Sequence, residues 1–475
     1  MSFYTAIGLE VHVQLRTRSK MFCGCSTEYG APPNTHVCPV CLGYPGAMPT
    51  MNEEAIRLTV LMGLMIGSRI NSYSKFDRKS YFYPDMPKNY QISQYDQPLC
   101  IGGSVNINVG GVTKPIRVTR IHLEEDVGKN MHFEQTSGVD FNRAGIPLME
   151  IVTEPDMASP DEAFAFLHAI KQIAMYAGVS DCDLEKGNLR VDVNCSVRMD
   201  AEGPLGTKTE IKNMNTFKGV HNALEYEVSR QEEILLSGGI VLQETLRWDA
   251  DQGTTTGMRS KEDAHDYRYF PEPDLMPICL SGETIDDLRR TLPELPAARR
   301  SRLVSQYGLP DYDAGVLVAD KAVADYFEAV AELSSNPKAV SNWVMTEMLR
   351  MLAESDTTID NVRIGAHELA ELISLVDCGT ISSTAAKDVF MEMFQQGGRP
   401  ADIVESKGLR QVSDVDAIEL LVARAMTENP ASVADYKAGK KAAAKFLVGQ
   451  VMRLSKGKAD PRMVDRMVES KLSGS

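Results

Sequence analysis

The sequence predicts an α+β protein in which a large, mainly antiparallel sheet domain precedes helical segments. Up to about residue 274, apolar and polar residues alternate with period two, as in "GLEVHVQL" (8–15) and "RVDVNCSVRM" (190–199), which is typical of strands buried on one face. The stretch "SVNINVGGVTKPIRV" (104–118) places two such runs around a Gly-Gly pair and predicts a hairpin. Beyond this region the pattern becomes helical, with long segments rich in Ala, Leu, Val and Met.

Two breaks divide the chain into three predicted domains. The proline-rich passage "TLPELPAARR" (291–300) ends the alternating region, and "QQGGRP" (395–400) interrupts the helical pattern with turn-forming residues. We therefore expect a sheet domain over residues 1–293, an all-helical domain over 294–400 and a small helical tail domain over 401–475.

The chain has no predicted membrane span and no predicted targeting signal. Its longest apolar run, Leu58–Gly67, is too short to cross a bilayer. It instead predicts a buried helix, begun by Thr50 with Glu53 as its capping box. The first ten residues, "MSFYTAIGLE", lack a basic segment followed by an apolar one. We therefore expect a cytoplasmic protein, in which nine cysteines stay reduced and clustered ones indicate a metal before a disulfide.

Charge is distributed unevenly along the chain. The 475 residues carry a net charge of −15 at pH 7, so no overall basic field indicates nucleic acid, yet residues 406–475 hold 13 Lys and Arg against 8 Asp and Glu. In "ADYKAGKKAAAKFLVGQVMRLSKGK", one continuous helix would place three lysines on a single stripe with a fourth alongside: Lys437, Lys441, Lys445 and Lys440. Such a stripe is either an ordinary solvated face or a contact for phosphate groups of a nucleic acid.

Four clustered cysteines give the strongest local signal. Cys23, Cys25, Cys38 and Cys41 form a C-x-C-x12-C-x2-C pattern, whose two close pairs can surround one ion tetrahedrally, and thiolates are the ligands that structural Zn²⁺ prefers. Four protein ligands leave no open position, so a zinc ion here would be structural. Two alternatives stay open: His36 replaces one ligand, or the four thiols are unrelated.

Carboxylates on strand faces form a second candidate site. They are Glu10, which shares its strand face with His12, the run Glu124-Glu125-Asp126, Glu150, Asp192 and Glu210. Acids that meet on one sheet face need a hard cation or basic groups to neutralise them, and Lys79, Arg190 and Lys212 are available. These residues indicate a mixed site for Mg²⁺ and phosphate, with a solvated sheet face as the alternative. The sequence lacks the glycine-rich phosphate loops of common nucleotide-binding folds, so a nucleotide would bind on another architecture.

The stretch Arg78–Leu99 combines four tyrosines and two lysines with few aliphatic residues. Its three prolines exclude a long helix or a central strand, and buried tyrosines need partners for their hydroxyl groups. The stretch is therefore either an ordered surface loop or a wall of a ligand pocket.

Eight ordered blocks of the sequence closely resemble the B-subunit family of aspartyl/glutamyl-tRNA amidotransferases. The blocks are "IGLEVHVQL", "CPVCLGYPGAMP", "KSYFYPDMPKNYQISQYD", "IHLEEDVGK", "DFNRAGIPLMEIVTEPD", "LRVDVNCSVR", "TEIKNMNTF" and "DYRYFPEPDL". The resemblance spans nearly the whole chain. It implies a cradle domain with a zinc-binding insertion, then a helical domain, then a tail that holds the body of a tRNA.

The resemblance also implies an activity and its partners. Members of the family use ATP and Mg²⁺ to phosphorylate the side-chain carboxylate of glutamate on tRNA(Gln) or of aspartate on tRNA(Asn), and ammonia then displaces phosphate to leave an amide. Phosphoryl transfer needs mostly positioning and neutralisation of oxygen charge. Because the chain lacks an amidase signature, a partner amidase subunit, acting as a glutaminase, would supply ammonia, and a small third subunit would complete a heterotrimer.

Position by position, the resemblance implies roles for individual side chains. The residues implied to hold Mg²⁺ are Glu10, His12, Glu125 and Glu150, with Glu124 as the alternative to Glu125. The residues implied to act on the reacting carboxylate and phosphate are Lys79, Tyr81, Glu125, Asp192, Glu210 and Lys212. Nucleotide contacts are implied for Arg190, Asn194 and Asn213, and tRNA contacts for the four tail lysines. On this interpretation, the tyrosine-rich stretch is a pocket wall.

Two rival functions predict different behaviour. An ATP-dependent ligase of a free metabolite would turn over ATP without tRNA. A zinc-ribbon RNA-binding protein would retain RNA without forming ADP. The carboxylates argue against the second rival, because acids repel phosphate unless a metal ion intervenes.

Overall fold

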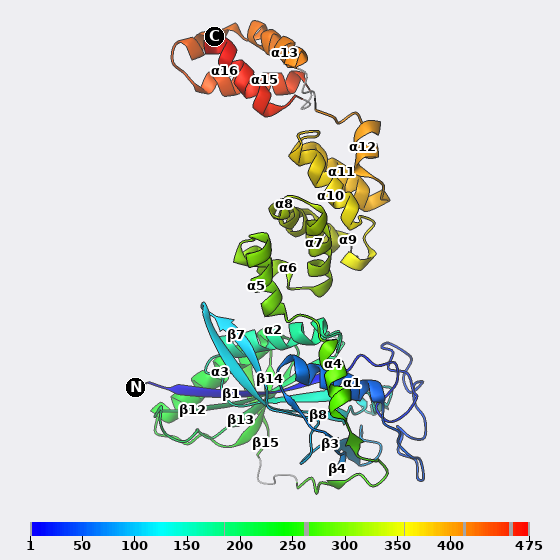
Figure 1. The fold of residues 1–475 in the computed structure, drawn as a ribbon. Coiled ribbons are helices and arrows are strands. Elements are labelled where there is room, and N and C mark those ends of the chain that lie inside the picture. Colours follow the sequence, from blue (N-terminus) through cyan, green and yellow to red (C-terminus); the bar gives the residue numbers. More distant parts are fainter. Residues whose placement is uncertain are drawn as a thin grey trace. The chain divides into compact units, whose positions relative to one another are not determined.

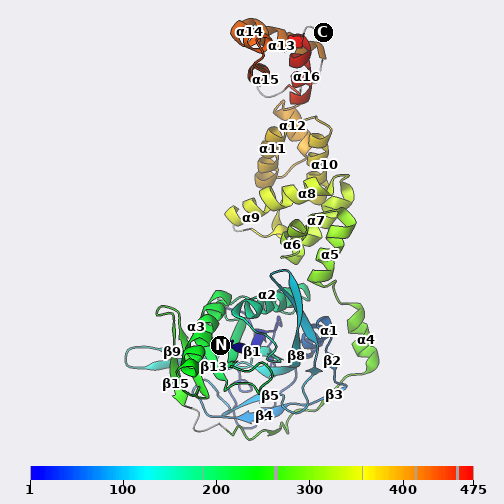
Figure 2. The same cartoon turned by 90° about the vertical axis from the view of Figure 1, so that its left-hand side faces the viewer.

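The computed structural model describes residues 2–184, 186–260, 266–355, 357–411, 415–455 and 459–473. The chain forms two compact units that meet in sequence between Pro296 and Ala297. The described strands all belong to the first unit, and the second unit is helical (Figures 1 and 2). The predicted α+β class is confirmed.

A ten-stranded sheet forms the centre of the first unit. In spatial order its strands are β15 (Thr254–Ser260), β14 (Glu244–Asp249), β13 (Thr209–Met214), β12 (Leu189–Arg198), β1 (Tyr4–Gln14), β11 (Pro147–Thr153), β8 (Val112–Glu125), β6 (Cys100–Ile101) and β2 (Arg69–Ile70), with β7 (Ser104–Val109) also paired to β8. Strands β13 and β14 run parallel, and the other pairs of described strands in this sheet are antiparallel.

The β7–β8 pair confirms the predicted hairpin. Val109 pairs with Val112 across the turn, and Gly110 and Gly111 have φ angles of 60° and 83°. A two-residue turn with two positive φ angles matches the twist of the flanking strands, and glycine adopts it without a steric penalty.

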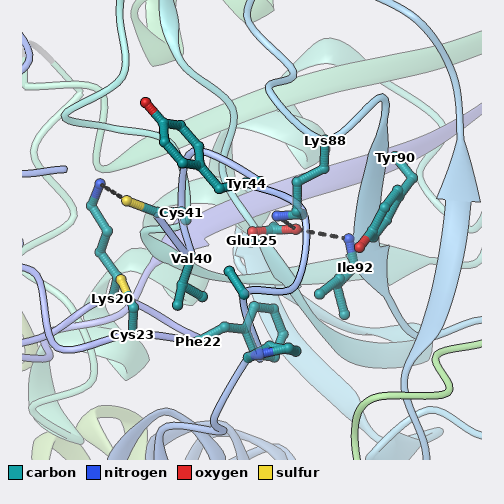
Figure 3. A pocket seen from close by; sticks show the side chains of 14 residues that line it. Lys20, Phe22, Cys23, Val40, Cys41, Tyr44, Lys88, Tyr90, Ile92 and Glu125 are labelled. Atoms are coloured by element: carbon teal, nitrogen blue, oxygen red, sulfur yellow. Dashed lines mark hydrogen bonds and ion pairs between the residues drawn. The ribbon is translucent and has the colours of Figure 1, made fainter. Parts of the chain in front are cut away.

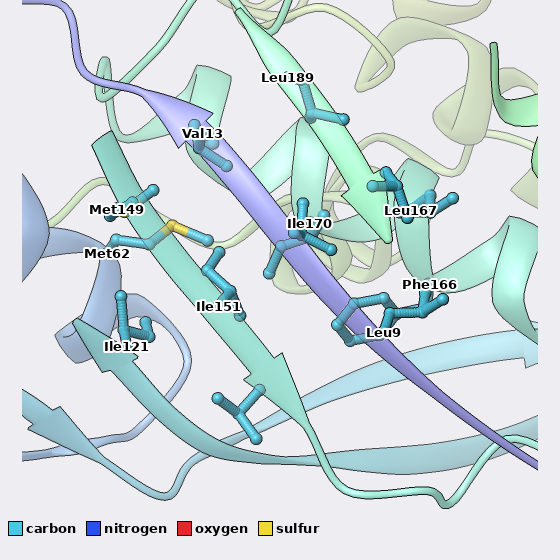
Figure 4. Close-up of a cluster of buried hydrophobic side chains, with 14 of the residues drawn as sticks. Leu9, Val13, Met62, Ile121, Met149, Ile151, Phe166, Leu167, Ile170 and Leu189 are labelled. Carbon is cyan, nitrogen blue, oxygen red and sulfur yellow. The ribbon is translucent and has the colours of Figure 1, made fainter. Parts of the chain in front are cut away.

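Three helices cover one face of this sheet: α1 (Glu53–Met65), α2 (Pro160–Tyr176) and α3 (Phe217–Leu236). Their apolar sides meet the apolar residues of the alternating strands, and Figure 4 labels Leu9, Val13, Ile121, Met149, Ile151 and Leu189 from strands beside Met62, Phe166, Leu167 and Ile170 from helices. Burying each such side chain stabilises the fold by about 1.5–3 kcal/mol. The alternation therefore turns the polar residues of the same strands to the opposite face.

Helix α1 confirms the predicted buried helix, but its cap differs from the prediction. The side chain of Asn52, rather than Thr50, accepts hydrogen bonds from the backbone N–H groups of Glu54 and Ala55. Asparagine is among the best N-cap residues. The N–H of Thr50 instead donates to the carbonyl of Phe22.

Smaller elements flank the sheet. They are the three-stranded sheet of β16 (Phe270–Pro271), β4 (Asp77–Ser80) and β5 (Tyr90–Ser93), the pair β9 (Lys129–His132) and β10 (Ser137–Asp140), the pair β3 (Tyr73–Ser74) and β17 (Ile278–Cys279), and helix α4 (Gly282–Arg290). Helix α4 packs on α1. Strand β5 and most of β4 come from the tyrosine-rich stretch, and the two strands pair with each other.

The second unit contains two hydrophobic cores. The first core uses α5 (Pro296–Tyr307), α6 (Asp311–Leu317), α7 (Lys321–Leu333), α8 (Pro337–Asn342), the π-helix η1 (Trp343–Met348), α9 (Leu349–Ser355), the 3₁₀ turn η2 (Ile359–Asn361), α10 (Ala366–Asp377), α11 (Ser383–Gln396) and α12 (Pro400–Ser406). The second core uses α13 (Val415–Glu428), α14 (Pro430–Lys437), α15 (Ala442–Leu454) and α16 (Pro461–Ser473). Among the described residues, no helix combines the length and apolarity that a bilayer span requires.

The predicted interruption at 395–400 is present, but it does not mark the change of core. Gly397 and Gly398 have φ angles of 75° and 108° and separate α11 from α12. Ile403 and Val404 of α12 nevertheless pack into the first core, and the buried residues of the second core begin at Ile418. By packing, α12 belongs with the helices before it, and the domain boundary at 400/401 stays a prediction.

Candidate active site

A row of polar side chains crosses four neighbouring strands on the face opposite the helices. His122 of β8 pairs with Glu150 of β11, and Glu150 pairs with His12 of β1. His12 in turn pairs with Arg190 of β12. Directly opposed residues on one sheet face have neighbouring side chains, so strand register brings together groups that are far apart in the sequence.

His12, Glu124 and Glu150, called the His12 group below, offer ligand atoms within 4.8 Å of one another. Nε2 of His12 lies 3.5 Å from Oε1 of Glu124 and 3.4 Å from Oε2 of Glu150. Nε2 of His122 lies 3.3 Å from the same Glu150 oxygen. Carboxylate oxygens and an imidazole nitrogen are ligands for divalent cations. His122 contacts Glu150 as an outer residue that would orient a ligand.

Electrostatics in the His12 group favour a positive charge at its centre. Burial alone would lower the pKa of His12, but a hydrogen bond to Glu150 and the charge of Glu124 raise it to about 9. Burial would raise the pKa of Glu150, whereas His122 and His12 hold it well below its ordinary value. Burial raises the pKa of Glu124. A divalent cation would take over the role of the His12 proton and release it on binding.

Glu124 of the His12 group also shifts the pKa values of Lys79 on β4 and of Tyr81, two residues further along the chain. Burial alone would lower the pKa of Lys79, but Glu124 and Glu150 raise it, so the ammonium group stays protonated. Burial and the charge of Glu124 raise the pKa of Tyr81, so its phenol stays neutral. No described residue forms an ion pair or hydrogen bond with the Lys79 ammonium. A charged group without a carboxylate partner is suited to bind a substrate oxyanion.

A second group of acids, called the Lys212 group, lies on the same sheet face. Glu10, Asp192 and Glu210 offer oxygen atoms within 4.8 Å of one another. Nζ of Lys212 donates to Asp192 at 2.6 Å and lies 3.1 Å from Glu210. Burial alone would lower the pKa of Lys212, but these two carboxylates raise it. The Nδ2 group of Asn194 donates to Glu10 at 3.0 Å, so the structure brings together four implied pocket residues around Lys212.

Arg190 and Asn213, both implied nucleotide contacts, differ in their surroundings. Arg190 donates to Asp126 at 2.8 Å, and the charge of Asp126 raises the pKa of Arg190 despite burial. Asn213 is exposed, has a φ of 72° and donates to the backbone carbonyl of Trp248 at 3.0 Å. Its amide N–H₂ group is therefore committed to strand β14, which weakens the case for a nucleotide contact.

Two cavities open beside these groups. One of about 310 Å³ borders Gly8, Glu10 and Asn194. Another of about 770 Å³ borders Lys129, Arg143 and Arg190, among other residues. Both volumes lie in the range of small-molecule and cofactor sites.

Glu125 lies apart from the His12 group. It follows Glu124 on β8, and successive side chains of a strand point to opposite faces. Its Oε1 accepts a hydrogen bond from Nζ of Lys88 at 2.5 Å and another from the backbone N–H of Ile92 at 2.9 Å (Figure 3). The geometry therefore places Glu124, the alternative to Glu125, beside His12 and Glu150, and it places Glu10 in the Lys212 group. The implied Mg²⁺ ligand set of Glu10, His12, Glu125 and Glu150 stays a prediction.

The four cysteines, called the cysteine group, come together as the pattern predicts. The sulfur atoms of Cys23, Cys25, Cys38 and Cys41 all lie within 4.8 Å of one another, and His36 is not part of this set. A hydrogen bond from Cys23 and, to a smaller extent, the charge of Lys20 lower the pKa of Cys41 to about 4 against the effect of burial. This arrangement favours a thiolate and fits tetrahedral zinc, so the cluster could hold zinc.

The cysteine group and Glu125 border the same small cavity of about 90 Å³. Figure 3 shows Cys23 and Cys41 on one side of it and the Lys88–Glu125 pair on another. Lys20 is 1% exposed and its Nζ lies 3.6 Å from Sγ of Cys41. Residues 20–49 therefore supply both the cysteines and one wall of this cavity.

The tail lysines do not lie on one helix. Helix α14 ends at Lys437, Gly439 has a φ of 98°, and α15 begins at Ala442. The positive φ favours glycine and ends the first helix. Lys437, Lys440, Lys441 and Lys445 are all exposed, and Nζ of Lys440 lies 3.0 Å from Oδ1 of Asp435. The predicted continuous stripe is therefore wrong, although the four charges remain at one helix–turn–helix junction.

Comparison with known proteins identifies the family. Residues 5–286, more than half of the chain, match the model of the GatB/GatE catalytic domain. The chain belongs to the GatB family. Residues 325–472 of this GatB-family chain also match the model of the GatB domain.

Curated relatives of this GatB-family chain share about half of its residues. The B subunits of the aspartyl/glutamyl-tRNA(Asn/Gln) amidotransferases from Thermoanaerobacter sp. (strain X514) and Brevibacillus brevis are 51% identical over 475 residues and 50% identical over 476 residues, with 100% of each chain covered. The protein of the same name from Caldicellulosiruptor saccharolyticus is 52% identical over 477 residues, with 99% of each chain covered. The family resemblance read from the sequence blocks is thereby confirmed.

Sequence reasoning missed several residues that the structure places at the site. His122 contacts Glu150, Lys88 pairs with Glu125, and the ring of Tyr267 lies beside Lys79. The alternation in "IHLEED" carried a usable signal, because the buried Ile121 and Leu123 put His122 and Glu124 together on the other face. No comparable signal links Tyr267 to Lys79, since they lie far apart in sequence.

Proposed function

We propose that this chain is the ATP-dependent subunit of a tRNA amidotransferase. It acts on glutamate attached to tRNA(Gln), on aspartate attached to tRNA(Asn), or on both. It phosphorylates the side-chain carboxylate of the attached amino acid and then amidates it with ammonia. The names of the relatives support the reaction class, and the geometry of the sheet face supports the ATP-dependent mechanism.

The observation that carries the proposal is the ammonium of Lys79, with which no described residue forms an ion pair or hydrogen bond, beside the His12 group. The acids and the imidazole can hold a divalent cation, and Lys79 supplies a second positive charge with free donors. Two carboxylates alone would repel ATP and a carboxylate substrate. A cation site combined with a free ammonium attracts both, and it neutralises the oxygen charge of phosphoryl transfer.

The proposed reaction has two balanced steps. A carboxylate oxygen of the aminoacyl group attacks the γ-phosphorus of ATP, the bond from phosphorus to the ADP oxygen breaks, and an acyl phosphate forms. Ammonia then attacks the acyl carbon, the carbon–oxygen bond to phosphate breaks, and the nitrogen loses a proton. Phosphorylation is needed because a free carboxylate is a poor electrophile.

Chain residues would share this work. Lys79 would contact the carboxylate and phosphate oxygens, and the neutral phenol of Tyr81 can donate one hydrogen bond. Mg²⁺ held by His12, Glu124 and Glu150 would bind phosphate oxygens and stabilise their charge. Glu10 of the Lys212 group lines one neighbouring cavity and Arg190 lines the other, so both are suited to position nucleotide or substrate.

Partners and a structural metal complete the proposal. A partner amidase would deliver ammonia by a protected route, because free ammonia is mostly protonated near neutral pH, and a small third subunit would complete the heterotrimer. The cysteine group would hold a structural Zn²⁺. Residues 401–475 would contact the tRNA body through Lys437, Lys441 and Lys445. We place the reaction in the cytoplasm.

The proposal is tested by product formation in the assembled enzyme. The chain is purified with its partner subunits and given ATP, Mg²⁺ and ammonium, with either glutamyl-tRNA(Gln) or uncharged tRNA. Ammonium bypasses the glutaminase, so the assay reports on this chain. We expect ADP and amidated aminoacyl-tRNA with the charged tRNA alone. ADP formation that ignores the aminoacyl group, or no ADP at all, would overturn the proposal.

A further inference from the structure

We propose that Tyr267 is a positioning residue that holds the ammonium group of Lys79 through a cation–π contact. In this arrangement Lys79 keeps its charge and leaves its three N–H donors to the substrate. The inference rests on the proposed function, in which Lys79 binds the oxygens of the reacting carboxylate and phosphate.

The contact itself is the first argument. Nζ of Lys79 lies 5.0 Å from the centre of the Tyr267 ring, inside the limit of about 6 Å for an attractive cation–π interaction. The same nitrogen has no ion-pair or hydrogen-bond partner among the described residues. An aromatic face stabilises a cation without accepting all of its hydrogen bonds, whereas a carboxylate at contact distance would occupy them.

The neighbouring lysines provide a contrast. Lys88 is 10% exposed and pairs with Glu125 at 2.5 Å, and Lys212 pairs with Asp192 at 2.6 Å. Partly buried cations are ordinarily neutralised in this way. Lys79 differs because its ammonium group lies over an aromatic ring and no described residue forms an ion pair with it. This arrangement is expected for an ammonium group that must exchange its partner during the reaction.

The ring of Tyr267 is held rigidly. Tyr81 packs edge-on to it, with ring centres 6.2 Å apart and an interplanar angle of 75°. Tyr269 packs at 6.1 Å and 70° and itself stacks on Tyr95 at 4.3 Å and 10°. Such edge-to-face and stacked pairs are favourable ring geometries. Two rings therefore pack directly against the platform on which the ammonium rests, and a third ring supports one of them.

The backbone fixes the platform relative to Lys79. The N–H of Ser80, the residue after Lys79, donates to the carbonyl oxygen of Tyr267 at 2.9 Å. Phe270 pairs with Arg78, the residue before Lys79, where β16 joins β4. The segment from Tyr267 to Phe270 is thus attached on both sides of Lys79, which positions the Tyr267 backbone relative to β4.

Substitutions that keep or remove the ring test the inference. Tyr267→Phe keeps the aromatic face, and Tyr267→Leu removes it. A graded series follows from replacing Tyr267 with phenylalanines that carry one, two or three ring fluorines, because fluorine weakens the negative face without changing the ring shape. The control is Tyr312→Leu, which makes the same change at a side chain that is 74% exposed on α6.

We expect kcat to follow the ring's negative face. With partner subunits and ammonium as donor, Tyr267→Phe should stay within about twofold of wild type, and Tyr267→Leu should lose about tenfold. The fluorinated series should fall stepwise, with thermal stability unchanged, and Tyr312→Leu should equal wild type. Full kcat in Tyr267→Leu, or a flat fluorinated series, would overturn the inference; the series remains decisive if the leucine variant does not fold.

A parallel measurement on Lys79→Ala separates this inference from the proposed function. Full activity in Lys79→Ala would overturn the proposed role of Lys79, and with it the purpose of the platform. Loss of activity in Lys79→Ala together with full activity in Tyr267→Leu would overturn the cation–π inference alone.

Discussion

The cysteine group and the His12 group can each hold a metal ion, yet they are built in opposite ways. The cysteine group offers four soft thiol ligands from one short segment, and four protein ligands leave no position for substrate. The His12 group offers three ligands from three strands, and Lys79 beside it has no carboxylate partner among the residues that the structure describes. A closed group suits a resident structural ion, whereas an open group suits an ion that also contacts substrate.

The comparison extends to how each group is neutralised. Near the cysteine group, the buried Lys20 contacts Cys41 directly. In the His12 group a proton on His12 offsets the acids, and a divalent cation can displace it. The difference teaches that the positive charge at the closed group already contacts a ligand, whereas part of the positive charge at the open group can be exchanged. The predictions below test this division.

The largest expected effect is the loss of activity when the open group is altered. Lys79→Ala and Glu150→Ala should each lower kcat by about 10²-fold or more, because charge stabilisation of the reacting oxygens is lost. The measurement is ammonium-dependent amidation of glutamyl-tRNA(Gln) by the assembled enzyme. Full activity in either variant, with normal folding and tRNA binding, would contradict the assignment of the His12 group and Lys79 to the reaction.

Removal of a thiolate should instead affect stability. Cys41→Ser should lower the free energy of unfolding of the first unit by about 2 kcal/mol or more, because metal binding contributes to folding. Metal analysis of the wild-type protein should find about one zinc per chain, and the variant should lose it. Cys100→Ser, a buried cysteine outside the group, is the control for zinc content. Freshly purified wild type without zinc would refute the structural-ion assignment.

Glu124 and Glu125 provide the sharpest test of the open group. Glu124→Gln should raise the Mg²⁺ concentration needed for half-maximal activity about tenfold, because one ligand charge is lost. Glu125→Gln should leave that concentration unchanged, since Glu125 contacts Lys88 and Ile92 instead. Titration of both variants with Mg²⁺ distinguishes them. A reversed pattern would return Glu125 to the ligand set implied by the family resemblance.

The smallest expected effect concerns the tail. Charge reversal at Lys437, Lys441 and Lys445 should weaken tRNA binding several-fold and flatten its salt dependence by about one unit of slope per lost phosphate contact. Charge removal at Lys440 should do less, because this lysine already pairs with Asp435. Binding is measured at several salt concentrations. An unchanged slope in the triple variant would make the lysines an ordinary solvated face.

The contrast between the two groups also explains what the sequence could predict. The cysteine ligands lie within 19 residues of one another, so spacing alone predicts their meeting. The His12 group depends on which strands are neighbours and on their register, and alternation gives only the face of each side chain. The roles of His12 and Glu150 are therefore implied only by family resemblance, and the resemblance leaves Glu124 and Glu125 as alternatives although they point to opposite faces of β8.

Other features depended on longer-range structure. The hairpin at Gly110 and the sheet faces were predictable because turn chemistry and period-two alternation are local. Tyr267 reaches Lys79 through the pairing of β16 with β4, which no local pattern specifies. Gly439 signals the break in the tail helix, because glycine commonly ends helices, whereas the spacing of the lysines favours one continuous helix.

The most direct test of the central claim follows an oxygen atom. Glutamyl-tRNA(Gln) is prepared with ¹⁸O in the side-chain carboxylate and incubated with the assembled enzyme, ATP, Mg²⁺ and ammonium, and the released phosphate is analysed by mass spectrometry. If the carboxylate is phosphorylated and ammonia then displaces phosphate, each phosphate formed during amidation carries one oxygen from the carboxylate. Unlabelled phosphate accompanying amidated product would contradict the account, because ATP would then have been cleaved without activating the carboxylate.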